Sequence, residues 1–215
     1  MSVKSFRQTL RSLSPEDDGL SGQIDSDWGQ GRALFGGLVS AMGLRAARRA
    51  APGWTPRSVM TSFSAPVSTD PLHARVDTLR EGRSALFTEV RVVQGGAPRA
   101  VVLATFGAGR PESRALAGPP APADAPRPDT LQAMPYIEGL VPTFTQHFEY
   151  RWYRGAFPYT GGNEPEFAGY VRLREDPIVD DAELVLALID AWPCPALSVL
   201  DRFVPSSTVT WSVEL

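Results

Sequence analysis

The segment Gly31–Arg45, GRALFGGLVSAMGLR, joins a clear helical pattern to residues that ordinarily weaken a helix. Its apolar side chains recur at the spacing of one helix face, and they are Phe35, Leu38, Val39, Met42 and Ala46. Gly36 and Gly37 nevertheless stand in the first turn, where each costs up to ~1 kcal/mol relative to alanine. We expect a helix over residues 33–50 whose first turn something approaches closely, either a packed part of the chain or a ligand.

Short strands are expected after this helix. They are Arg57–Val67, Leu72–Thr78, Leu86–Val93 and Ala100–Phe106. Turn-forming residues at 68–71, 81–83 and 95–96 separate them. A helix followed by hairpin-linked strands predicts an α+β unit in which an antiparallel sheet packs on the helix.

A segment rich in proline, alanine and glycine, residues 109–142, divides the chain. Its prolines fix φ and remove backbone donors, so we expect a partly polyproline-like linker between a unit at 1–108 and a unit at 143–215. The expected elements of the second unit are strands Thr145–Tyr153 and Phe167–Leu173, a helix Asp181–Trp192 and a strand Ser207–Leu215. Asp180 is the expected N-cap of that helix, with Glu183 completing a capping box. By comparison with the first unit, the second lacks two or more strands.

The composition excludes several classes of function. The chain has 215 residues, is 43% hydrophobic and carries a net charge of −3, so it lacks the basic surface of a nucleic-acid or acidic-membrane binder. One cysteine and two histidines leave no disulfide and no typical zinc site, and no metal is expected. No signal peptide or membrane-spanning run is visible, so we expect a cytoplasmic protein that binds no membrane.

Three features are candidates for chemistry. Asp190 ends an apolar helix, where the macrodipole disfavours negative charge by ~0.3–1 kcal/mol, so it is either a functional carboxylate or an exposed one paired to Arg202. Gly36 and Gly37 could offer N–H groups to an oxyanion, although close packing of the helix explains them as well. The hydroxyls of 206–210 could orient a water, although such residues usually cap turns.

Two of these patterns together resemble a known family. Phe35-Gly36-Gly37 opens a helix, and Val76–Ser84, VDTLREGRS, connects two strands of the predicted sheet. In this order the two motifs resemble the type II (TesB-like) acyl-CoA thioesterases, over about residues 17–215 apart from the linker. The resemblance implies a double hotdog fold, in which two units each wrap a curved antiparallel sheet around a long helix, with the active site between them.

The resemblance also implies the site. Asp190 matches the family's general base and Thr208 its hydroxyl, with Ser207 as the alternative. Gly36 and Gly37 would stabilise the oxyanion, and Phe35 would contact the substrate. The family's glutamine lies on a strand that would follow Leu215, and no residue here matches it.

The activity implied is hydrolysis of an acyl-CoA thioester to free acid and CoA, as performed by hydrolases of fatty acid metabolism. CoA enters only as part of the substrate, and no other cofactor is expected. The strand Ser207–Leu215 would lack a neighbour, and exposed sheet edges pair with other chains, so a homo-oligomer is expected.

Two other functions remain open. An enoyl-CoA hydratase on the same fold needs an Asp–His pair, and neither His73 nor His147 matches that motif. A non-catalytic hotdog that binds acyl groups is the second alternative, and the missing strands favour it.

Overall fold

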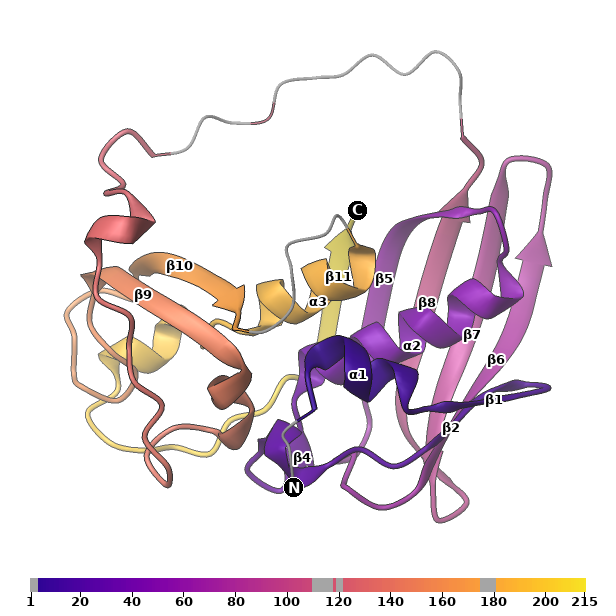
Figure 1. Cartoon of the computed structure of the whole chain (residues 1–215), viewed down its shortest axis with the longest axis horizontal. Coiled ribbons are helices and arrows are strands. Elements are labelled where there is room, and N and C mark those ends of the chain that lie inside the picture. Colours follow the sequence, from indigo (N-terminus) through magenta and orange to yellow (C-terminus); the bar gives the residue numbers. More distant parts are fainter. Residues whose placement is uncertain (1–3, 110–117, 119–121, 175–180) are drawn as a thin grey trace.

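The computed structural model describes residues 4–109, 118, 122–174 and 181–215, and it has the expected α+β architecture (Figure 1). Seven antiparallel strands form the main sheet in the order β1-β2-β6-β7-β8-β5-β11. Their bounds are β1 Ser14–Glu16, β2 Gly19–Gly22, β5 Thr55–Phe63, β6 Leu72–Glu81, β7 Ala85–Gln94, β8 Ala97–Gly107 and β11 Thr210–Glu214. All four strands predicted before the linker are therefore present. The first of them ends at Phe63, before Pro66, because proline has no N–H to give to a ladder.

Helix α2, Gly36–Ala50, lies across this sheet and supplies the centre of the core (Figure 1). Its apolar stripe meets the inward-facing residues of β7 and β8, which alternate with outward-facing ones. The contact is close, since a methyl group added at Gly43 would lie 2.5 Å from Cγ2 of Val102. The helix and sheet of the first unit thus form as the alternating pattern predicts.

A short helix that the sequence analysis missed precedes the sheet. Helix α1, Phe6–Arg11, buries Phe6, Thr9 and Leu10 against α2 and the aromatic residues around Trp28. Between β2 and α2 run a 3-10 turn, η1 (Ser26–Trp28), and a pair of two-residue strands, β3 (Gly29–Gln30) and β4 (Ala33–Leu34). This segment covers the beginning of α2.

The second unit has its own small sheet and a helix. Strands β9, Phe148–Gly155, and β10, Phe167–Leu173, form an antiparallel hairpin, and α3 spans Ala182–Asp190. The N-cap of α3 is Asp181, whose side chain accepts the Glu183 N–H at 3.2 Å. The N-cap predicted at Asp180 is therefore one residue off, and Asp180 itself lies outside the described residues.

The last strand joins the sheet of the first unit instead of the hairpin. β11 pairs with β5 along its whole length, from Thr210 opposite Ser62 to Glu214 opposite Ser58. The expectation that Ser207–Leu215 lacks a neighbour is therefore wrong on this side, because β5 is available at the edge of the larger sheet. β11 itself is the last strand in the sheet order.

The described part of the predicted linker, residues 122–142, packs against the hairpin. Its only regular element there is a 3-10 turn, η2, at Pro128–Thr130. Backbone carbonyls of this segment accept hydrogen bonds from two hairpin side chains, Tyr170 at 2.7 Å and Arg151 at 3.0 Å. This half of the linker is thus part of the second unit's surface. A further 3-10 turn, η3 (Thr143–His147), leads into β9.

The segment Ala182–Val199 is apolar enough, by length and composition alone, to pass for a membrane span. However, α3 ends at Asp190 and a separate 3-10 turn, η4, begins at Pro195. The buried face of α3, with Leu184, Leu186 and Ala187, packs on α2. This is how an ordinary core helix of a folded domain looks.

Candidate active site

The two long helices pack side by side in opposite directions, so the beginning of α2 meets the end of α3 (Figure 1). A methyl group added at Gly36 would lie 2.9 Å from Oδ2 of Asp190. One added at Gly37 would lie 3.0 Å from the Cα of Ala187 and 2.7 Å from the Phe35 ring. Both glycines are therefore required by close approach, Gly37 by helix packing and Gly36 by the Asp190 carboxylate.

This arrangement places Asp190 in the field of a second helix. Asp190 lies at the unfavourable, negative end of α3, but it also faces the positive end of α2. The backbone N–H of Gly37 donates to its carboxylate. The site that the sequence analysis assembled from Gly36, Gly37 and Asp190 is thus one location in the structure, although their catalytic roles stay a prediction.

Asp190 has an unusually high affinity for its proton. Burial raises the pKa of its carboxyl from 3.8 to about 6, and the Gly37 N–H opposes that rise only in part. Within the described residues no arginine, lysine or histidine forms an ion pair with Asp190, and Arg202 is exposed and makes none with it. The alternative of an exposed carboxylate paired to Arg202 is therefore wrong.

Aromatic side chains lie close to this carboxylate. The ring of Phe63, at the end of β5, approaches to 3.3 Å from the position that a Gly36 methyl group would occupy. Tyr150 of β9 and Trp192, which follows α3, meet edge to face with ring centroids 5.7 Å apart. Burial raises the pKa of Tyr150 above its ordinary value, and the charge of nearby Asp190 adds to the rise. Asp190 therefore lies among apolar rings contributed by both units.

Thr208 and Ser207, the predicted hydroxyl groups, lie on the extended chain just before β11, and both are exposed. The neighbouring Val209 carbonyl accepts the N–H of Phe63 at 2.8 Å, which brings this segment to the edge of the site. Among the residues that the structure describes, neither hydroxyl contacts Asp190. Their assignment stays a prediction.

Phe35 is fully buried and stacks on Phe144, with ring centroids 4.1 Å apart. It also fills the space beside Gly37. Its contacts are those of a packing residue that holds the start of α2 against the second unit. The predicted contact with substrate remains untested.

Both histidines lie beside aspartates, which the sequence analysis did not foresee. Nε2 of His147 lies 3.4 Å from Asp27, and its ring stacks on Trp28 with centroids 3.7 Å apart. Nε2 of His73 lies 2.9 Å from Asp18. No sequence signal connects these partners, because residues far apart in the chain form both pairs. His147 is 8% exposed and packed on the Trp28 ring.

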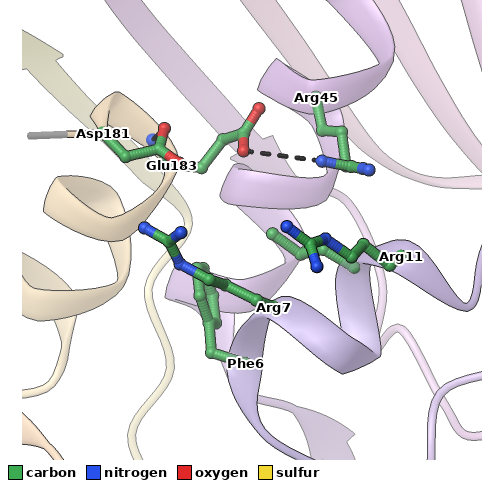
Figure 2. Close-up of a pocket in the computed structure, with 7 residues that line it drawn as sticks. Phe6, Arg7, Arg11, Arg45, Asp181 and Glu183 are labelled. Carbon is green, nitrogen blue, oxygen red and sulfur yellow. Dashed lines mark hydrogen bonds and ion pairs between the residues drawn. The ribbon is translucent and has the colours of Figure 1, made fainter. Parts of the chain in front are cut away.

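The other end of the α2–α3 pair carries a contrasting group of charges (Figure 2). A small pocket there is lined by Arg7 and Arg11 of α1, Arg45 of α2, and the residues Asp181 and Glu183. Glu183 is 6% exposed, with Arg45 at 3.8 Å and Arg48 at 3.6 Å. Burial and then Asp181 raise the pKa of Glu183, while the arginines oppose the rise. Across the described residues no group of three or more histidines, cysteines or acids is placed to hold a metal ion.

Known structures share this fold. A conserved hot dog fold protein from Alicyclobacillus acidocaldarius superposes with a TM-score of 0.85 at 24% identity, covering 99% of this chain and 78% of that one. A proposed thioesterase II from Thermobifida fusca gives 0.80 at 19% identity, covering 96% and 78%. The acyl-CoA thioesterase II TesB2 from Mycobacterium marinum gives 0.61 at 22% identity, covering 85% and 66%. No curated protein sequence matches the chain.

Two family domains account for most of the chain. Residues 24–107 match the acyl-CoA thioesterase N-terminal domain, and residues 119–215 match the acyl-CoA thioesterase C-terminal domain. The double hotdog arrangement of the elements, with the paired helices α2 and α3, agrees with both matches. The chain belongs to the acyl-CoA thioesterase family of hotdog-fold proteins.

Proposed function

We propose that this protein hydrolyses acyl-CoA thioesters, with Asp190 as the general base that activates water. The observation that supports this role most strongly is the Asp190 carboxylate itself. It is held against the N-terminus of α2 with no cationic partner among the described residues, and its pKa is raised to about 6. A base with a pKa just below neutrality is ionised at cytoplasmic pH and still accepts a proton readily.

In the proposed reaction, Asp190 takes a proton from a water molecule whose oxygen attacks the thioester carbonyl carbon. The carbonyl oxygen becomes an oxyanion. The tetrahedral intermediate then collapses, the carbon–sulfur bond breaks, and the proton held by Asp190 passes to the departing CoA thiolate. One thioester and one water thus give one acid and one thiol.

The backbone amides of Gly36 and Gly37 have different roles in the proposed reaction. The Gly37 N–H donates to Asp190 and orients it. The Gly36 N–H is at the first position of α2, where a helix has no internal acceptor, and it finds no protein acceptor within the described part of the chain. We therefore assign the oxyanion contact to Gly36 first, with Thr208 or Ser207 holding the water.

Two alternatives make different demands on the site. A non-catalytic acyl-CoA binder needs no group of raised pKa. An enoyl-CoA hydratase needs an acid–base pair in contact with substrate, and the buried Asp27–His147 pair is the group in this structure that such a reaction would use. A cytoplasmic location and self-association, with the outer side of β11 as the available sheet edge, are part of the proposal.

The test is thiol release from acyl-CoA esters of increasing chain length, with crotonyl-CoA hydration and calorimetric binding measured in parallel. Asp190→Asn should lower kcat by ~10²–10⁴-fold, because that is the usual contribution of a general base. Asp201→Asn is the matched control, since Asp201 is an exposed carboxylate on a loop. Wild-type turnover by Asp190→Asn would refute the assignment. Binding without thiol release by the wild type would favour the non-catalytic function.

A further inference from the structure

We propose that Tyr150 is a positioning residue that holds Asp190 in place by fixing the end of helix α3. This inference rests on the proposed function of Asp190. It adds to the site a residue that the family motifs of this chain do not include. Tyr150 lies on β9, in the hairpin of the second unit.

The connection is a single hydrogen bond one residue beyond the carboxylate. The Tyr150 hydroxyl donates to the carbonyl oxygen of Ala191 at 2.9 Å. Ala191 is the C-cap of α3 and directly follows Asp190. The last carbonyls of a helix have no partner within it, so this hydroxyl satisfies one of them and ties the helix end to β9.

The ring of Tyr150 is itself held on two sides. It meets Trp192 edge to face at 5.7 Å and lies 6.1 Å from the ring of Phe148. Trp192 in turn fits against Gly169 of β10, where an added methyl group would lie 2.6 Å from the indole. The hairpin therefore fixes the tyrosine, and the tyrosine fixes the residue after Asp190.

The hydroxyl works through the backbone and not on the substrate. Its proton is engaged with the Ala191 carbonyl, and the phenol stays neutral because its pKa is raised by burial and by the charge of Asp190, which Arg174 only partly offsets. The tether matters because Asp190 must stay within reach of a Gly37 N–H and beside Gly36. Small misplacements of a catalytic group are costly, about 10²-fold for 1 Å.

The test compares two tyrosines of the same hairpin. Tyr150→Phe removes the tether and keeps the ring. Tyr170→Phe is the matched control, because the Tyr170 hydroxyl of β10 also donates to a backbone carbonyl, that of Pro126 at 2.7 Å, away from Asp190. We expect Tyr150→Phe to lower kcat by roughly 10–100-fold with little change in KM, and Tyr170→Phe to leave both unchanged.

A second readout does not depend on catalysis. The Asp190 carboxyl can be titrated by NMR in protein carrying ¹³C-labelled aspartate, with Asp190→Asn identifying its signal. The wild-type midpoint should lie at about 6. In Tyr150→Phe it should fall toward the ordinary range, because a loosened helix end admits water to the carboxylate; in Tyr170→Phe it should not move.

The outcomes separate this inference from the proposed function. A shifted Asp190 titration in Tyr150→Phe alone supports the tether even if the wild type hydrolyses no thioester, in which case only the proposed function fails. An unshifted titration together with wild-type kcat would overturn the tether while leaving Asp190 as the base. Equal losses in both tyrosine variants would also overturn it, since they would show a general effect on hairpin stability.

Discussion

The two ends of the α2–α3 helix pair each enclose an acidic side chain, and the two acids have opposite surroundings. Glu183, at one end, faces Arg45 (Figure 2) and also Arg48. Asp190, at the other, faces a glycine amide and aromatic rings, and no cation among the described residues is paired with it. Burial raises the pKa at both ends, but charge compensation is present at only one.

Under the proposed function, this difference separates a structural acid, Glu183, from a reactive one, Asp190. A buried carboxylate that is paired with cations links the two units, and the cations offset part of the free-energy cost of burying its charge. A half-buried carboxylate held by a helix N-terminus keeps a strong tendency to take up a proton, which is the property that a general base needs. The proposed function thus places chemistry at one end of the helix pair and a stabilising charge contact at the other.

After Asp190→Asn itself, the largest effect on activity is expected from filling the space at the Asp190 end of the helix pair. Gly36→Ala places a methyl group 2.9 Å from Oδ2 of Asp190, so the carboxylate must move, and kcat/KM should fall by about 10²-fold. The matched control is Gly43→Ala, in the middle of the same helix, whose methyl group would meet Val102 at 2.5 Å. Gly43→Ala should cost about 1–3 kcal/mol of stability through overpacking and leave turnover per folded molecule unchanged. Equal rate losses in both variants would remove the distinction between the site and the core.

The pH dependence of turnover should come from the reactive end alone. The deprotonated form of Asp190 is the base and its pKa is about 6, so kcat/KM should be constant above that pH and fall tenfold for each unit below it. Glu183→Gln should leave this profile unmoved. A rate profile without an acidic limb near pH 6 would contradict the role of Asp190.

The stability of the two acid variants should change in opposite directions. Asp190→Asn should raise the free energy of unfolding at pH 8 by about 0.5–2 kcal/mol, because it removes an uncompensated buried charge. The folded-state pKa lies above the unfolded value, so wild-type stability declines as pH rises from about 3.8 to about 6, and the gain should vanish below that window. Chemical denaturation at pH 8 and at about pH 3 measures both points, and a loss of stability at pH 8 would contradict the comparison.

The smallest effect on activity is expected at the paired end. Glu183→Gln leaves Arg45 and Arg48 without their buried counter-charge, and the cost should be about 1 kcal/mol because both arginines are partly exposed. Turnover should stay within about twofold of wild type, since Glu183 lies near the other end of α3, roughly 10 Å from Asp190 at 1.5 Å per residue. A large loss of kcat would mean that the two ends are coupled.

The helices and strands that the sequence predicts correctly are those defined by the periodicity and turn residues of their own segment. The helix around Met42 and the strand Phe167–Leu173 were predicted because periodicity and turn residues define them. The sequence singles out Asp190 because its negative charge lies at the negative end of its own helix. In the structure the same carboxylate faces the positive end of helix α2. The candidate site was thus indicated in the sequence by a residue that goes against the local preference for positive charge at the end of a helix.

The remainder depends on contacts between distant residues. Helix α1 is only six residues long, and its one local signal is the capping box formed by Ser5 and Gln8; its packing against Trp28 depends on residues distant in the sequence. The partner of β11 could not be foreseen, because a strand's own sequence does not say which sheet edge it joins. The position of Thr208 relative to Asp190 likewise depends on the pairing of β11 with β5, and the position of Tyr150 depends on how the hairpin packs against the end of α3.

The pairing of β11 with β5 has a consequence for how the protein can be taken apart. β11 is hydrogen-bonded to β5, so the second half of the chain contributes a strand to the sheet that the first half builds. After cleavage of the peptide chain between Gly107 and Phe148, the pairing of β11 with β5 would therefore still hold the two fragments together. Neither half expressed alone would contain all the strands of the main sheet.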